Sequence, residues 1–91
     1  MQKLDPNQVK EALASVPEWK LSGQTISRVF EFKDFAGALQ FVNAVGRVAE
    51  EANHHPDIDV RWNKVTLALS THSAGGLTAS DFDLARKVDR L

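Results

Sequence analysis

The fold of this chain follows most directly from residues 57–72, which read DIDVRWNKVTLALSTH. Polar and apolar side chains alternate without a break over the first six of these residues. A period of two is typical of a strand with one buried face. Asn63 and Lys64 then predict a two-residue turn, because asparagine tolerates a positive φ, and residues 65–72 predict the partner strand. We therefore expect an antiparallel β-hairpin.

The register of this hairpin predicts which histidines meet. With the turn at Asn63 and Lys64, the apolar pairs are Trp62 with Val65, Val60 with Leu67, and Ile58 with Leu69. The pairs on the opposite face are Arg61 with Thr66, Asp59 with Ala68, and Asp57 with Ser70. A slip of one residue would mix the two faces, so their separation supports the register. The same count places His55 opposite His72, where Cβ atoms are about 4.5–5.5 Å apart. These two imidazoles are therefore expected to share one small ligand.

The segments before and after this hairpin predict an α+β domain. The expected elements are a helix over 6–15 capped by Asp5, strands at 19–21 and 25–32, a helix over 35–53 capped by Asp34, and a last helix that begins at 78–81. The order is α-β-β-α-β-β-α within a single domain, residues 1–91. Hairpins imply a four-stranded antiparallel sheet with the helices packed on one face.

Composition excludes several classes of function. The chain has 91 residues, of which 43% are hydrophobic and 25% charged, with a net charge of −1 and no cysteine. A cysteine nucleophile, a cysteine-ligated metal and a disulfide are therefore excluded. Basic residues are scattered among acidic ones, so we expect no nucleic-acid partner.

No membrane partner is expected either. No apolar run reaches the roughly 18 residues that a membrane helix needs, and residues 1–6 lack the apolar core of a signal peptide. We therefore expect a cytoplasmic protein. So small a chain buries only about 60–65% of its unfolded surface, which favours association with copies of itself.

Three histidines supply most of the acid–base capacity near neutral pH, because tyrosine is absent as well. His54, His55 and His72 all fall within residues 54–72. Glu50 precedes His54 by four residues, so on one helix its carboxylate would orient that imidazole. Three imidazoles can bind zinc, but the usual motifs are missing and neighbouring histidines seldom share one ion. The cluster therefore favours an acid–base site without a metal.

Each of these residues also has a structural interpretation. A His-His-Pro sequence at a helix end is often ordinary surface, and Glu50 fits a solvated helix face. Asp81 is sufficiently explained as the third residue of a capping box. Trp62 fits the core at a strand end, or an exposed ring beside the histidines that stacks on a flat ligand.

The spacing of these residues resembles the signature of the pterin-4a-carbinolamine dehydratases. The matching positions are Glu50, His54-His55-Pro56, Trp62, Ser70-Thr71-His72 and Asp81 within Gly75-Gly76-Leu77-Thr78-x-x-Asp81. The residue types and all the intervals agree, and the order of elements fits the family over essentially the whole chain. Asn53 stands where better-known members carry aspartate.

The resemblance implies an enzyme that removes water from 4a-hydroxytetrahydropterin to give quinonoid dihydropterin. A reductase then regenerates tetrahydropterin for aromatic amino acid hydroxylases. The family pattern gives His54 and His72 acid–base roles and His55 chiefly a substrate-binding role. Residues 53–55 and 70–72 match the pterin-binding segments, and Glu50 and Asp81 match supporting residues. No metal or cofactor is implied.

The resemblance also implies a homodimer or homotetramer, formed through sheet edges and the long second helix. Two alternatives stay open at this point. One is a non-enzymatic dimerisation or binding partner that retains the pterin pocket, since an animal member of the family also serves as a transcription cofactor. The other is a related pterin substrate, for example in molybdopterin metabolism.

Overall fold

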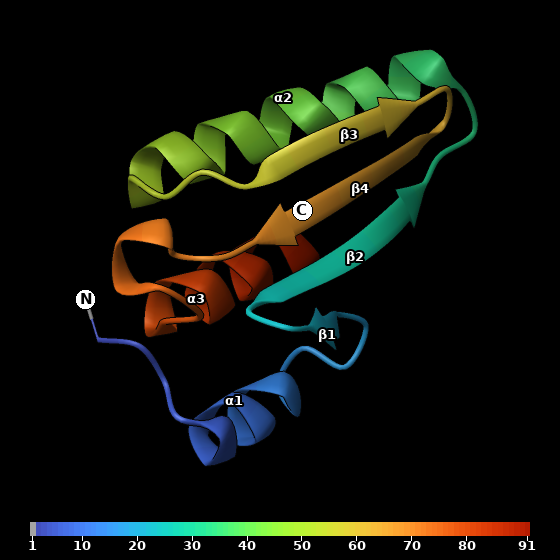
Figure 1. Cartoon of the computed structure of the whole chain (residues 1–91). Coiled ribbons are helices and arrows are strands. Elements are labelled where there is room, and N and C mark those ends of the chain that lie inside the picture. The colour runs from blue at the N-terminus through green and yellow to red at the C-terminus, as the bar shows by residue number, and fades with distance from the viewer. Residues whose placement is uncertain (1) are drawn as a thin grey trace.

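The helices and strands of the computed structural model follow the predicted order (Figure 1). The structure describes residues 2–91, so Met1 of the predicted domain lies outside the described residues. The elements are α1 (Pro6–Leu13), β1 (Lys20–Ser22), β2 (Thr25–Glu31), α2 (Phe35–Ala52), β3 (Asp57–Arg61), β4 (Lys64–Leu69), the 3₁₀ helix η1 (His72–Ala74) and α3 (Ala79–Asp89). The strands form one antiparallel sheet in the order β1-β2-β4-β3. The predicted fold class is confirmed.

Short polar side chains begin the three α-helices, as the sequence predicts. Asp34 accepts a hydrogen bond from the backbone N–H of Gly37 (2.8 Å) at the start of α2. Asp5 begins α1, and Thr78 begins α3 together with Asp81 in a capping box. These caps satisfy N–H groups that have no partner inside the helix. Within residues 2–91, no helix is long and apolar enough to span a membrane.

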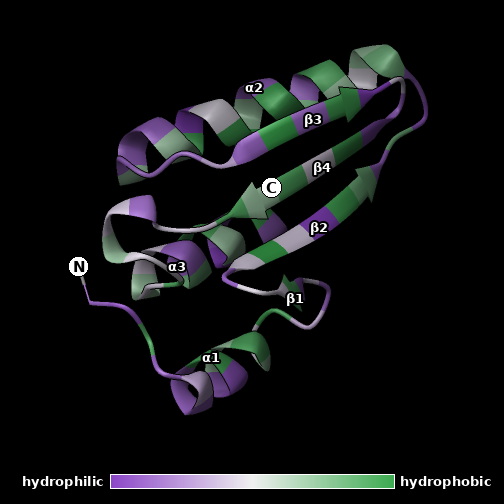
Figure 2. Ribbon diagram, viewed as in Figure 1, coloured by the Kyte–Doolittle hydropathy of each residue, from purple (hydrophilic) through white to green (hydrophobic). Residues whose placement is uncertain are grey.

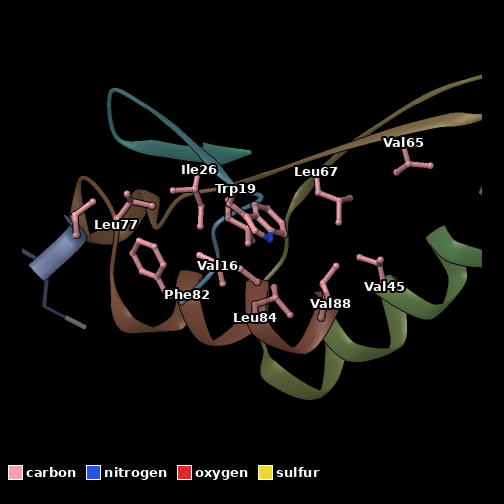
Figure 3. Close-up of a cluster of buried hydrophobic side chains, with 14 of the residues drawn as sticks. Val16, Trp19, Ile26, Val45, Val65, Leu67, Leu77, Phe82, Leu84 and Val88 are labelled. Atoms are coloured by element: carbon pink, nitrogen blue, oxygen red, sulfur yellow. The ribbon is translucent and has the colours of Figure 1, made fainter. Parts of the chain in front are cut away.

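The helices α2 and α3 cover one face of the sheet, and the core lies between (Figures 1 and 3). On β4, Val65, Leu67 and Leu69 are buried against this face, and α3 contributes Phe82 and Leu84. Hydrophilic and hydrophobic residues alternate along β3 (Figure 2), and buried residues alternate with more exposed ones along β4. The alternate residues therefore lie on the uncovered side of the sheet, here called the outer face: Thr25, Ser27, Asp57, Asp59, Thr66 and Ala68.

The predicted register of the β3-β4 hairpin is wrong by two residues. Arg61 pairs with Lys64 and Asp57 with Ala68, so the turn consists of Trp62 and Asn63. Each β3 residue therefore meets a β4 residue two positions earlier than expected. Because the shift is even, the residues of β3 and β4 stay on their predicted faces, whereas Trp62 leaves the ladder for the turn.

A contact distant in sequence accounts for this turn. The Asn63 side chain donates a hydrogen bond to the carbonyl oxygen of Phe32 (2.8 Å), and the Phe32 N–H donates to the Asn63 carbonyl oxygen (2.8 Å). These bonds fix Asn63 at the end of β2, while Trp62 takes the left-handed conformation with φ 52°. A tryptophan seldom adopts a positive φ, so the turn signal favoured the wrong pair.

Candidate active site

The end of α2 separates two adjacent histidines. Asn53 ends the helix in the left-handed conformation (φ 50°, ψ 42°), and the backbone N–H of His54 returns to the Ala49 carbonyl oxygen (3.1 Å). After this turn the two imidazoles have different surroundings. The side chain of His54 is 15% exposed, whereas that of His55 is 59% exposed.

The imidazole of His54 is held by a buried carboxylate. Its Nε2 lies 2.5 Å from Oδ1 of Asp81, which is completely buried at the start of α3. The predicted pairing of His54 with Glu50 is therefore wrong. Left-handed Asn53 ends the helical repeat before His54, so the four-residue spacing no longer places the two side chains together.

The second oxygen of Asp81 is also fully engaged. Oδ2 accepts hydrogen bonds from the Thr71 hydroxyl (2.8 Å) and from the Thr78 backbone N–H (2.9 Å). Since Thr71 gives its one hydroxyl proton to Asp81, the Thr78 hydroxyl is the donor in the 2.9 Å bond between the two threonines. Asp81 is thus both the predicted helix cap and the anchor of His54.

Glu50 contacts the other histidine of the pair. Its carboxylate lies within hydrogen-bond distance of His55 Nε2. Both side chains are exposed, 76% for Glu50 and 59% for His55. The contact joins residues five positions apart and involves no other element of the fold. It is therefore a local surface pair.

His55 and His72 line one small cavity of about 70 Å³ at the end of the sheet. The residues around it are Thr25, His55, Asp57, Ala68, Leu69, Ser70 and His72. His54 is not among them. The structure therefore brings two of the three predicted histidines to a common cavity on the outer face.

His55 and His72 line the cavity although they are not paired residues of neighbouring strands. Strand β4 ends at Leu69, and His72 begins η1 instead of extending the strand as predicted. The cause is a tight loop in which Thr71 and Gly76 exchange backbone hydrogen bonds (3.0 and 3.3 Å). The predicted direct opposition of His55 and His72 is therefore wrong, although both lie at the same end of the hairpin.

The other predicted contacts divide into three groups. Ser70 lines the cavity and donates a hydrogen bond to the Gln24 carbonyl oxygen (2.8 Å), whereas Thr71 is buried behind it. Asn53 is exposed beside the histidines. Trp62 is 69% exposed at the turn, the opposite end of the hairpin from His55. Its interpretation as core or as a neighbour of the histidines within one chain is wrong.

Sequence reasoning missed four residues of this region. These are Thr25, Asp57, Ala68 and Leu69, all of which line the cavity. A signal was present for Asp57, because it shares the predicted outer face with His55. Thr25 comes from β2, and only the pairing of β2 with β4 brings it there. Within residues 2–91, no three His, Asp or Glu side chains are arranged to hold a metal ion.

The pterin 4 alpha carbinolamine dehydratase family model matches residues 2–91. The chain belongs to this family. A relative from Acidobacterium capsulatum that carries the dehydratase name is 55% identical over all of this chain and 99% of its own length. A second, from Nocardia farcinica, is 51% identical over 97% of this chain and 93% of its own. The resemblance inferred from the histidine motif is confirmed.

Two solved structures agree with the fold. A transcriptional coactivator/pterin dehydratase from Brucella melitensis is 35% identical, with a TM-score of 0.92 over 98% of this chain and 97% of that chain. A pterin dehydratase-like protein described as a RuBisCO assembly factor in the alpha-carboxysome is 24% identical. Its TM-score is 0.68 over 80% of this chain and 87% of that chain, and this likeness concerns the fold alone.

Proposed function

We propose that this chain is a hydro-lyase that dehydrates 4a-hydroxytetrahydropterin to quinonoid dihydropterin. The C4a–O bond breaks, and the hydroxyl leaves as water with a proton from an acid on the protein. A base removes the N5 proton, and the electron pair of the N5–H bond forms the new C=N bond. The reaction needs proton transfer at two positions and no redox group, which suits imidazoles.

One observation carries this proposal: two histidines line one cavity, and a buried carboxylate holds the third, which directly precedes His55 in the chain. A carboxylate accepts but does not donate, so neutral His54 donates its Nε2 proton to Asp81 and keeps Nδ1 as an acceptor. His54 is therefore assigned as the base. His72 has no recorded side-chain partner within residues 2–91, so both its ring nitrogens are available, and it is assigned as the acid. His55, held by Glu50, binds the substrate.

The remaining predicted residues have binding or supporting roles in this proposal. Ser70 and Asn53 flank the histidines and contact the pterin, whereas Thr71 acts from behind through Asp81. Trp62 contributes only from a neighbouring copy of the chain, because it lies at the far end of its own hairpin. Such a contact accords with the homodimer or homotetramer that we propose. Light scattering at micromolar concentration that detects only a species of about 10.1 kDa would contradict the oligomer.

Stopped-flow absorbance tests the activity directly. Chemically prepared 4a-hydroxytetrahydropterin is followed with and without protein, and its spontaneous dehydration supplies the baseline. We expect a rate that rises in proportion to protein concentration. Loss of the acceleration in a double variant, His54→Ala with His72→Ala, is the expected control. An undiminished rate in that variant would overturn the mechanism, and no acceleration by the wild type would overturn the function.

The cellular setting that we propose is tetrahydropterin recycling in the cytoplasm, with a reductase acting on the product. A second candidate is a non-enzymatic binding or dimerisation role, favoured by the double description of the Brucella melitensis relative as coactivator and dehydratase. Pulldown with the wild type and with a triple histidine variant separates the two. Partners captured equally by both, with no dehydratase activity in the wild type, would support the binding role.

A further inference from the structure

Two aspartates on the outer face of β3 have different partners. Asp59 forms an ion pair with Arg61, whose Nε lies 3.2 Å from Oδ2. Asp57 lies two residues earlier on the same face and lines the cavity with His55 and His72. Within residues 2–91 the structure records no hydrogen bond or ion pair for the Asp57 side chain. Its carboxylate is therefore available to a ligand in the cavity.

The surroundings of Asp57 fit the edge of a flat ring. Ala68 lies directly across the ladder from Asp57, and Ser27 pairs with Ala68 from the other side. Both side chains are small, so they leave space above the sheet beside the carboxylate. The cavity measures about 70 Å³, far below the roughly 300–1,000 Å³ of sites that enclose a whole drug-sized ligand. It can receive one edge of a heterocycle while the rest of the ring lies along the rim.

We propose that Asp57 determines the specificity of the site by binding the N3–H and 2-amino edge of the pterin. This inference rests on the proposed dehydratase function. The two donors point in the same direction, as the N–H groups of a guanidinium do, and a carboxylate accepts both in parallel. No other side chain lining the cavity carries a carboxylate.

The same placement orients the reacting atoms. C4a lies directly across the pyrimidine ring from C2, and N5 is bonded to C4a. With the amino edge bound to Asp57, the ring therefore points its reacting side away from β3. His72 lines the same cavity from η1, after the end of the neighbouring strand β4, so we expect the assigned acid on the side of the ring that faces away from β3. Asp57 takes no part in proton transfer.

The test compares Asp57→Asn with the matched control Asp59→Asn. Both changes remove one exposed carboxylate from the same face of the same strand. Stopped-flow kinetics give kcat and KM for 4a-hydroxytetrahydropterin. Competition binding gives the affinities of 7,8-dihydropterin and of 7,8-dihydrolumazine, in which an oxo group replaces the 2-amino group.

For Asp57→Asn we expect KM to rise about 10- to 100-fold, the usual effect of losing hydrogen bonds to a charged group, with kcat changed less than about threefold. The preference for dihydropterin over dihydrolumazine should fall by a similar factor. Asp59→Asn should stay within about twofold of the wild type in all of these values. Thermal unfolding of both variants should match the wild type, because both side chains are exposed.

An unchanged KM and an unchanged preference in Asp57→Asn would overturn the inference while leaving the dehydratase proposal intact. Equal losses in the two variants would also overturn it, because they would indicate a general effect of charge. If the wild type showed no turnover, the dehydratase proposal would be overturned. The affinity of Asp57→Asn for the two probes would still decide the role of Asp57.

Discussion

Residues 2–91 contain two histidine–carboxylate pairs that differ in burial and in the sequence distance between their partners. His54 and Asp81 are 15% and 0% exposed and join the end of α2 to the start of α3. His55 and Glu50 are 59% and 76% exposed and lie only five residues apart in the sequence. A buried pair is screened little by water and salt, whereas an exposed pair is screened strongly. The buried pair therefore holds two helices together, whereas the exposed pair is a weak contact at the surface.

Replacing each histidine by alanine should give the largest difference between the two pairs, measured as changes in kcat and KM. We expect His54→Ala to lower kcat by about 10²–10⁴, the usual contribution of general acid–base catalysis, with a fold that is retained. His55→Ala should mainly raise KM, because this ring binds substrate in our assignment. Stopped-flow kinetics of both variants give the two parameters separately. Equal effects on kcat would contradict the assignment of different roles.

Replacing the buried carboxylate tests the anchor. In Asp81→Asn the amide oxygen is needed at the position of Oδ2, because the Thr78 N–H can only donate. The NH₂ group therefore faces His54, which can no longer donate its Nε2 proton there. We expect a fall in kcat of about 10- to 100-fold, a part of the full acid–base contribution. The free energy of unfolding should fall by about 1–3 kcal/mol, because Thr71 and the Thr78 N–H lose a charged acceptor.

The ¹⁵N chemical shifts of His54 provide a measurement that stability alone does not move. In the wild type we expect the neutral ring to carry its proton on Nε2, and in Asp81→Asn on Nδ1. Urea denaturation monitored by tryptophan fluorescence gives the change in stability. A variant that is destabilised but keeps the wild-type tautomer and kcat would show that Asp81 only caps the helix.

The contrast also explains which features could be predicted from the sequence. Strand alternation, helix caps and the order of elements depend on neighbours in the chain, and all of them were predicted correctly. The partner of His54 lies 27 residues away, on α3. The four-residue rule pointed to Glu50 because it assumes that the helix continues, and left-handed Asn53 ends it.

The hairpin register failed for the same physical reason. Local turn chemistry favoured Asn63 and Lys64, but Asn63 is bonded to Phe32, 31 residues earlier. The error left the faces unchanged, so the histidines were still expected at the correct end of the sheet. The family signature then supplied Asp81 as a supporting residue, whereas local spacing explained it only as a helix cap. Its hydrogen bonds to His54 and Thr71 became visible only in the folded chain.

The smallest expected effect belongs to the exposed pair. We expect Glu50→Gln to change the free energy of unfolding by less than about 0.5 kcal/mol, since exposed ion pairs contribute little. Its amide oxygen can still accept a hydrogen bond from His55, so KM should change by no more than about threefold. Raising the salt concentration should reduce the difference between wild type and variant, because the pair is exposed. A loss of stability as large as that of Asp81→Asn would show that burial does not distinguish the two pairs.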